Sequence, residues 1–433
     1  MPIASTSTEP APRFIARVLT LAAAAGLVVF GLLPTLWQHE WAWVARLAVF
    51  SVLGLWLANT RWDWLKMIGV GTVMLLLANQ LLSPFIMDWL RSNEFIALGP
   101  RINRQIRIVG DVMPGFQGIQ HITTDGKGFR TTLPIDYEHK PAGALRVLAI
   151  GGSTTEQIYL DDRKTWTHLL QEGLTESLKR RVEVINTGVS GLRAVHQVAT
   201  LEQTLRYQPD LVVILMGLND WNKQVLDAMA ADRHGIGHWW AAMNYPETAL
   251  VFLSRQIRFL LRRSDSAEMP AAGKVEEIDG KYYSGQNDSL NRKPLRTFPG
   301  PIQVSAEFAE AAERLLAVCR QNKLRCIFLS QPNAYDPAIE PALRQRLWMT
   351  PPGADFTLSL EQMAAFATAY NNYLMQNLRG QGAEVCDVAK ALKPTTAFFY
   401  DDCHYNEGGA RAVAQSVLSC VVAGSPQAPA AAR

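Results

Sequence analysis

The sequence predicts an α/β fold with a parallel sheet, preceded by three transmembrane helices. Two observations support this prediction. From residue 146 onward, short apolar runs alternate with segments of helical spacing, and residues 1–90 are strongly apolar. Strands that alternate with helices imply a parallel sheet with helices on both faces. The chain has 433 residues, more than one hydrophobic core needs, so we expect more than one structural unit.

The sheet is expected to contain five strands. One of the five runs is apolar throughout, which is typical of a strand buried on both faces. The expected strands are Arg146–Ile150, Val182–Ile185, Leu211–Met216 (the fully apolar run), Arg325–Ser330 and Glu384–Asp387. Helical spacing predicts helices at Thr165–Leu178, Ala194–Tyr207, Val304–Asn322, Leu358–Leu378 and Glu407–Val422.

These elements define the expected domain organisation. Residues 146–424 are expected to form the α/β domain, and residues 91–145 a linker and lead-in segment. The stretch 221–300 breaks the alternation and is interpreted as an insertion. Within it, the amphipathic piece Leu250–Arg263 is expected to be either a lid helix or a helix on a membrane surface. The composition of the tail, residues 425–433, predicts disorder.

The three membrane spans are predicted from hydropathy. Val18–Gln38 and Met67–Met87 are uncharged runs of spanning length. Leu47–Thr60 reaches that length only if it is extended to include Trp43 and Arg46. Tryptophans cluster at the ends of these runs, as they do at membrane interfaces. The distribution of arginine and lysine places the N-terminus in the cytoplasm. We therefore expect a multi-pass protein of the inner membrane, in contact with the bilayer, with an extracytoplasmic α/β domain.

Charge and cysteine usage exclude several function classes. The formal net charge of +3 and the lack of a basic run interleaved with aromatic residues argue against nucleic-acid binding. None of the five cysteines forms a CxxC pair, so neither a zinc site nor a redox dithiol is predicted. They are expected to be buried apolar side chains or, in an oxidising compartment, one or two disulfides with at least one thiol left over. The sequence contains no motif for a cofactor or a metal.

Four short polar motifs lie at strand ends, where a parallel sheet of this kind binds its ligands. They are GGST at Gly151–Thr154, NTGVSG at Asn186–Gly191, GLND at Gly217–Asp220 and DDCH at Asp401–His404. Each alone is typical of a turn or a helix cap. Asp401 precedes His404 by three residues, so its carboxylate can accept a hydrogen bond from Nδ1–H and leave Nε2 free to take a proton. A glycine N–H or an asparagine amide can stabilise an oxyanion.

Together, and in this order, the four motifs resemble the SGNH, or GDSL-like, hydrolase family over about residues 146–422. The stretch GKGFR, Gly126–Arg130, is similar to a lead-in of bacterial members. One departure is GGS at the position of the family's GDS, a variant that many bacterial members carry. The resemblance implies a three-layer α/β/α, flavodoxin-like parallel sheet.

The resemblance also implies roles for individual residues. Ser153 is the expected nucleophile, His404 the general base and Asp401 the residue that orients His404, with Asp402 as the alternative. The expected oxyanion hole consists of the Ser153 N–H, the Gly191 N–H and the Asn219 side-chain amide.

Three functions are compatible with these residues. The first is an esterase that removes acyl groups, acetyl among them, from an envelope glycan or lipid through an acyl-enzyme on Ser153. The second is an acyltransferase that uses the same triad to O-acetylate an extracytoplasmic polysaccharide. The third is a non-catalytic module that binds glycans. Neither protein partners nor oligomeric state can be read from the sequence.

Overall fold

The computed structural model describes residues 63, 69, 71, 74, 75, 95–231, 271–279, 293–347, 354 and 356–423. The chain divides into two compact units, Met1–Leu90 with Arg233–Arg258, and Arg91–Asp232 with Phe259–Arg433. The first unit lies almost wholly outside the described residues, as does the amphipathic piece predicted at 250–263. The fold and the site described below therefore belong to the second unit.

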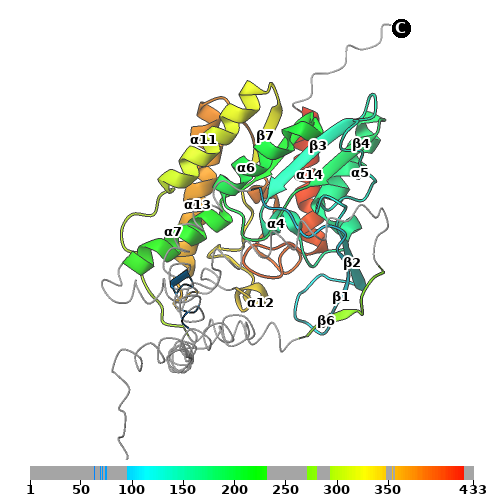
Figure 1. The fold of residues 1–433 in the computed structure, drawn as a ribbon. Coiled ribbons are helices and arrows are strands. Elements are labelled where there is room, and N and C mark those ends of the chain that lie inside the picture. The colour runs from blue at the N-terminus through cyan, green and yellow to red at the C-terminus, as the bar shows by residue number, and fades with distance from the viewer. Residues whose placement is uncertain are drawn as a thin grey trace, which may run out of the picture. The chain divides into compact units, whose positions relative to one another are not determined.

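The second unit is built on a five-stranded parallel sheet (Figure 1). Its strands in spatial order are β4 (Val182–Asn186), β3 (Leu145–Gly151), β5 (Leu211–Leu215), β7 (Arg325–Leu329) and β8 (Glu384–Cys386). This is the flavodoxin-like order, which changes direction along the chain at β3, next to β5. All five predicted strands are present within one residue at each end, and the predicted parallel α/β sheet fits the structure.

Helices cover both faces of the sheet (Figure 1). Helix α5 (Trp166–Leu178) packs against α14 (Glu407–Ala423), and α6 (Ala194–Thr204) packs against α11 (Ala306–Gln321). Several helices begin at an N-cap residue whose side chain accepts a hydrogen bond from a backbone N–H of the first turn. Examples are Thr165 for α5 and Ser305 for α11. The predicted helix at 358–378 is α13 (Leu360–Asn372), which continues as a π-helical stretch, η4 (Tyr373–Leu378).

A second, three-stranded sheet forms from the lead-in segment and part of the predicted insertion. Strand β1 (Asn103–Ile108) pairs antiparallel with β2 (Ile119–Thr123) and parallel with β6 (Glu276–Ile278). Between β1 and β2, Val112 and Met113 are buried in a small apolar cluster with Tyr400. This packing brings the β1–β2 connection beside the loop that carries the fourth motif.

The cysteines form two disulfides. Cys319 pairs with Cys326, and Cys386 pairs with Cys420, which links the edge strand β8 to α14. Cys403 is free and buried. Of the two alternatives that the sequence left open, the structure therefore has the one with two disulfides and one remaining thiol.

The structure corrects the prediction of a membrane region. In the part of the chain that it describes, none of the helices combines the length and the apolar character that a bilayer crossing requires. Hydropathy counts apolar residues but does not show that they form one uninterrupted helix of about 20 residues; α14, for comparison, has 17 residues. The three predicted transmembrane helices, the bilayer contact and the multi-pass inner-membrane localisation are therefore not upheld. The predicted spans lie almost wholly outside the described residues.

Candidate active site

Ser153 is the first residue of α4 (Ser153–Glu156), a short helix that directly follows β3. The turn before it is tightly packed, because a Cβ on Gly152 would lie 2.7 Å from Nδ2 of Asn219. The second motif packs against the same turn, where a Cβ on Gly188 would collide with the backbone nitrogen of Glu156. Glycine at both positions lets the first, second and third motifs meet at one edge of the sheet.

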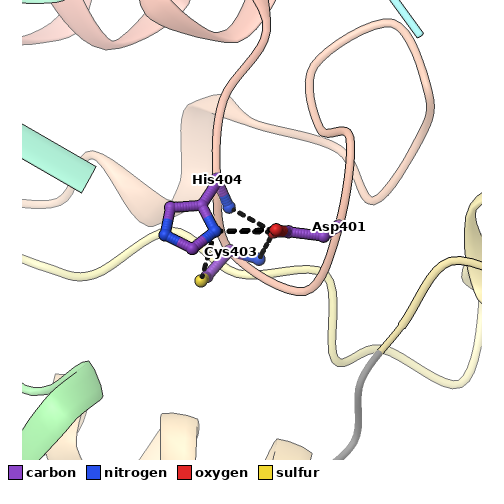
Figure 2. A group of neighbouring side chains, drawn as sticks. All are labelled: Asp401, Cys403 and His404. Atoms are coloured by element: carbon purple, nitrogen blue, oxygen red, sulfur yellow. Dashed lines mark hydrogen bonds and ion pairs between the residues drawn. The ribbon is translucent and has the colours of Figure 1, made fainter. Parts of the chain in front are cut away.

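The fourth motif brings His404 to Ser153 across 251 positions of sequence. Nε2 of His404 lies 2.7 Å from Oγ of Ser153. On the other side of the ring, Nδ1 lies 2.7 Å from Oδ2 of Asp401, and Figure 2 shows this carboxylate facing the ring. Oδ1 of Asp401 also accepts bonds from the backbone N–H groups of Cys403 (3.0 Å) and His404 (2.8 Å). The carboxylate therefore holds the tautomer that carries its proton on Nδ1 and leaves Nε2 toward the serine.

The pKa values of this pair move in opposite directions. Burial favours the neutral imidazole, but the charge of the Asp401 carboxylate, the hydrogen bond to it and the interaction with Cys403 together outweigh burial and raise the pKa of His404 well above the ordinary 6.5. Burial also works against the Asp401 carboxylate, yet the charge of His404 and the hydrogen bonds it accepts lower the pKa of Asp401. Asp401 is therefore ionised at neutral pH and stabilises a positive charge on His404.

Asp402, the alternative orienting residue, has different partners. Its side chain bonds the hydroxyl of the buried Tyr335, and its backbone carbonyl accepts the N–H of Ala334 at 2.7 Å. These contacts anchor the loop that carries the fourth motif to the segment after β7. The contact with Nδ1 of His404 is made by Asp401.

Of the residues expected to form the oxyanion hole, Ser153 and Asn219 line one pocket. Nδ2 of Asn219 donates to the Leu192 carbonyl at 2.9 Å, which leaves its second hydrogen for another acceptor. Leu192 lines this narrow pocket as well, which is partly open to solvent. Gly191 has a φ of +82°, a conformation that favours glycine.

Sequence reasoning missed Glu156, which connects the first and second motifs. Its Oε2 accepts both the backbone N–H of Ser190 at 2.5 Å and the Ser190 hydroxyl at 2.6 Å. Burial raises the pKa of Glu156, although the bonds from Ser190 and the charge of Arg130 counteract this. Glu156 thus fixes the residue that immediately precedes Gly191.

Arg130, the last residue of the GKGFR stretch, supports the segment after α4. Its guanidinium donates to the Gln157 and Leu160 carbonyls, both at 2.7 Å, and pairs with Asp162 at 2.6 Å. Arg130 is almost fully buried, so each of these bonds replaces a contact with water. In the sequence, the sign of this supporting role of Arg130 was the GKGFR stretch.

An aromatic cluster covers the other side of the histidine. The ring of Tyr400 stacks on that of His404 with centroids 5.6 Å apart and an interplanar angle of 14°. Phe116 and Tyr159 make edge contacts with Tyr400, at 5.3 and 6.3 Å between centroids. The sequence analysis did not identify these three aromatic residues.

One cluster has the residue types of a metal site. Among the described residues, Asp401, Cys403 and His404 offer donor atoms that all lie within 4.8 Å of one another (Figure 2). Two of these donors already bond each other, since Nδ1 of His404 faces the Asp401 carboxylate. Burial raises the pKa of the Cys403 thiol to about 12, so at neutral pH it remains protonated and is a poor ligand. The chemistry of the donor set therefore favours an acid–base role for His404 over metal binding.

The comparison with family models identifies one family. The model of the GDSL-like lipase/acylhydrolase family matches residues 149–412, which include the four motifs. No curated protein matches the chain with significant similarity.

Several solved structures resemble the chain at low identity. An alpha/beta hydrolase enzyme from the metagenome of Lake Arreo, Spain, is 16% identical, with 67% of this chain and 100% of that chain covered and a TM-score of 0.36. A carbohydrate acetylesterase family member from Sinorhizobium meliloti is 15% identical, with 64% and 97% covered and a TM-score of 0.33. An acetylxylan esterase from Geobacillus stearothermophilus is 14% identical, with 65% and 95% covered and a TM-score of 0.35.

Proposed function

Because the chain belongs to the GDSL-like lipase/acylhydrolase family and is an ester-hydrolysing enzyme, we propose that it cleaves its substrate through an acyl-enzyme on Ser153. The observation that carries this proposal is the continuous hydrogen-bonded path from the Ser153 hydroxyl through His404 to Asp401, with 2.7 Å at each contact. A serine hydroxyl is a weak nucleophile until a base within hydrogen-bond reach removes its proton.

The first half of the reaction forms the acyl-enzyme. Nε2 of His404 takes the Ser153 proton as Oγ attacks the ester carbonyl carbon, which gives a tetrahedral intermediate with a negative oxygen. Asp401 stabilises the imidazolium and keeps its orientation. His404 then gives its proton to the leaving alcohol, and the carbon–oxygen bond of the ester breaks. In the second half, His404 takes a proton from water as the water oxygen attacks the acyl carbon, which gives a second tetrahedral intermediate. The bond between that carbon and Oγ of Ser153 then breaks, His404 returns the proton to Oγ, and the acid is released.

The negative oxygen of the intermediate requires donors that are already in place. The Ser153 N–H, the Gly191 N–H and the second hydrogen of the Asn219 amide are the proposed donors. The single bond that Asn219 makes to Leu192 supports this role, because it orients the amide without using both of its hydrogens. Loss of one such donor typically raises the barrier by about 2.7–4 kcal/mol.

The experiment that tests the nucleophile combines turnover with covalent labelling. Wild-type protein should hydrolyse 4-nitrophenyl acetate and react with a fluorophosphonate probe, and Ser153→Ala should lose both activities while melting at the same temperature. Ser419→Ala is the matched control, because Ser419 lies on α14 and bonds only its own helix turn in the described structure. Labelling of the Ser153→Ala variant at the wild-type rate would reject the proposal. Preferential transfer of the acetyl group to an added glycan hydroxyl would identify an acyltransferase instead.

A further inference from the structure

The contact between Ser153 and His404 depends on how the chain is held around each residue. Their 2.7 Å hydrogen bond joins segments 251 positions apart, so packing and bonds between the two segments set the distance. A displacement of about 1 Å between reacting groups can cost on the order of 10²-fold in rate. The residues that follow the pair in sequence, Thr154 and Tyr405, both bond one further side chain, that of Gln331.

Gln331 lies just beyond the end of β7 and is anchored through its backbone. Its N–H donates to Oδ1 of Asn371 on α13 at 2.7 Å, and its carbonyl accepts Nδ2 of the same asparagine at 3.0 Å. The N–H of the preceding residue, Ser330, donates to the Cys386 carbonyl of β8 at 3.1 Å. Gln331 itself is almost fully buried. Its backbone is therefore fixed both to the edge of the sheet and to α13, and its amide extends from a defined position.

The amide of Gln331 has one orientation that satisfies its surroundings. Nε2 lies 2.9 Å from the Pro332 carbonyl, and because a carbonyl can only accept, the nitrogen must be at this end. Nε2 also lies 3.2 Å from the Tyr405 hydroxyl, to which its second hydrogen is donated. At the other end, Oε1 accepts the Thr154 hydroxyl at 3.3 Å. All three contacts are buried, so the amide is fully paired without water.

Thr154 and Tyr405 complete a closed ring of hydrogen bonds with Gln331. The Thr154 hydroxyl donates its only hydrogen to Gln331, so it is the acceptor in its bond with the Tyr405 hydroxyl. Donation therefore runs from Gln331 to Tyr405, from Tyr405 to Thr154 and from Thr154 back to Gln331. Buried bonds in such a network strengthen one another, and removal of one member leaves the other two incompletely paired.

The three residues of the ring adjoin both spaces beside Ser153. Thr154 and Gln331 line the pocket that contains Asn219, whereas Thr154 and Tyr405 line a crevice on the side of His404. Other walls of this crevice are Gln157 and the rings of Phe116, Tyr159 and Tyr400. The ring of hydrogen bonds thus lies next to the nucleophile and next to the base.

We propose that Gln331 is a positioning residue, which holds His404 and Ser153 at their bonding distance by joining the residues that follow them, Tyr405 and Thr154. The inference rests on the proposed function, since it assumes that Nε2 of His404 takes the Ser153 proton. Gln331 takes no part in bond making or breaking. The contact between His404 and Asp401 lies within one short loop and does not depend on Gln331.

Gln331→Met tests this role, because it removes the amide and keeps most of the side-chain volume. We expect kcat for 4-nitrophenyl acetate to fall between about tenfold and about 10²-fold. KM should change little, because both halves of the reaction use the same proton transfer and slow together. Fluorophosphonate labelling should slow in parallel with kcat. The acid limb of the pH–rate profile should stay in place, because Asp401 still sets the pKa of His404.

Gln171→Met is the matched control for the loss of a buried amide. Gln171 on α5 is also buried, and its amide accepts the Val184 N–H at 3.0 Å and donates to the Thr132 hydroxyl at 3.2 Å. Neither partner belongs to the four motifs. Gln171→Met should therefore lower the melting temperature without changing kcat or the labelling rate.

Two nearly isosteric variants test the ring separately, including the case in which Gln331→Met does not fold. Thr154→Val and Tyr405→Phe each remove one hydroxyl, and each should lower kcat by a factor similar to that of Gln331→Met. Because either change opens the same ring, the double variant should lose little more than one of them, whereas independent effects would multiply. Thr154→Ser keeps the hydroxyl and should retain most of the activity.

Three results would overturn the inference. Wild-type kcat and labelling rate in Gln331→Met, together with a lower melting temperature, would make Gln331 a purely structural residue. Multiplied losses in the double variant would show that the two hydroxyls act separately. An acid limb shifted in Gln331→Met would mean that the residue acts on the pair of His404 and Asp401. Full turnover by Ser153→Ala would instead refute the proposed function, whatever the result at Gln331.

Discussion

The pocket and the crevice on the two sides of Ser153 are lined by different kinds of residue. The pocket with Asn219 is lined mainly by residues of the first and third motifs, such as Gly152 and Gly217, and by residues at the ends of the parallel strands. The crevice with Gln157 is lined by large side chains, and Phe116 comes from the lead-in segment. The pocket with Asn219 therefore depends on the parallel sheet, whereas the crevice with Gln157 depends on the segments packed around the sheet. This difference predicts that changes in the pocket impair every substrate, and changes in the crevice alter the choice of substrate.

The largest effect outside the nucleophile is expected at Asp401. In Asp401→Asn the amide no longer stabilises the imidazolium or selects the tautomer, so kcat should fall on the order of 10⁴-fold on every ester. Protonated His404 cannot accept the Ser153 proton, so kcat/KM declines as the pH drops through the pKa of His404. In the wild type this decline should lie above pH 6.5, because Asp401 raises that pKa. In the variant the residual activity should persist to lower pH, as measured in a pH–rate profile.

Asp402→Asn is the matched control for this experiment. Asp402 bonds Tyr335, so its variant should keep the wild-type position of the acid limb, even if its stability decreases. If Asp402→Asn moved the acid limb and Asp401→Asn left it in place, the two carboxylates would have to exchange roles.

The next effect concerns the pocket side. Asn219→Ala removes a donor to the oxyanion, and kcat should fall by about 10²–10³ for 4-nitrophenyl acetate and for esters of other alcohols alike, with little change in KM. Asn222→Ala, on the same helix α7 (Leu218–Ala231), is the control. A loss confined to esters of one alcohol would contradict the separation of the two sides, because the oxyanion forms in the hydrolysis of every ester.

The smallest effect is expected at Glu156. In Glu156→Gln one atom can still accept the Ser190 N–H, but the paired bond to the hydroxyl is weakened, and Gly191 loses part of its positioning. We expect kcat to fall about tenfold at unchanged KM, corresponding to one weakened charge-assisted bond. Labelling by the fluorophosphonate probe should slow in parallel, whereas Glu172→Gln on the exposed face of α5 should change neither. Unchanged labelling together with a lower melting temperature would give Glu156 a purely structural role.

The same division explains what the sequence could predict. The strands were predictable because a run such as Leu211–Met216 is buried on both faces and therefore apolar throughout. Ser153, His404, Asp401 and Asn219 were identified because their motifs resemble, in order, those of the SGNH hydrolase family. The strand ends of a parallel sheet meet at one edge, which explains how motifs far apart along the chain come together.

The crevice was not predictable in this way. The proximity of Phe116 to Tyr400 depends on the small sheet of β1, β2 and β6, whose short strands carry no strong periodic signal. The transmembrane helices, in contrast, were predicted from a strong hydropathy signal, but the helices in the described part of the chain do not support them.

The central claim is that the Ser153 hydroxyl attacks the ester while His404 takes its proton. The most direct measurement is rapid acid quench of the enzyme during turnover of 4-nitrophenyl acetate, followed by mass spectrometry of its peptides. We expect one acetyl group on the peptide that contains Ser153, and none on that peptide in Ser153→Ala. Continued turnover with the acetyl group on another residue would contradict the account. Turnover without any acetylated peptide in the wild type would contradict it as well.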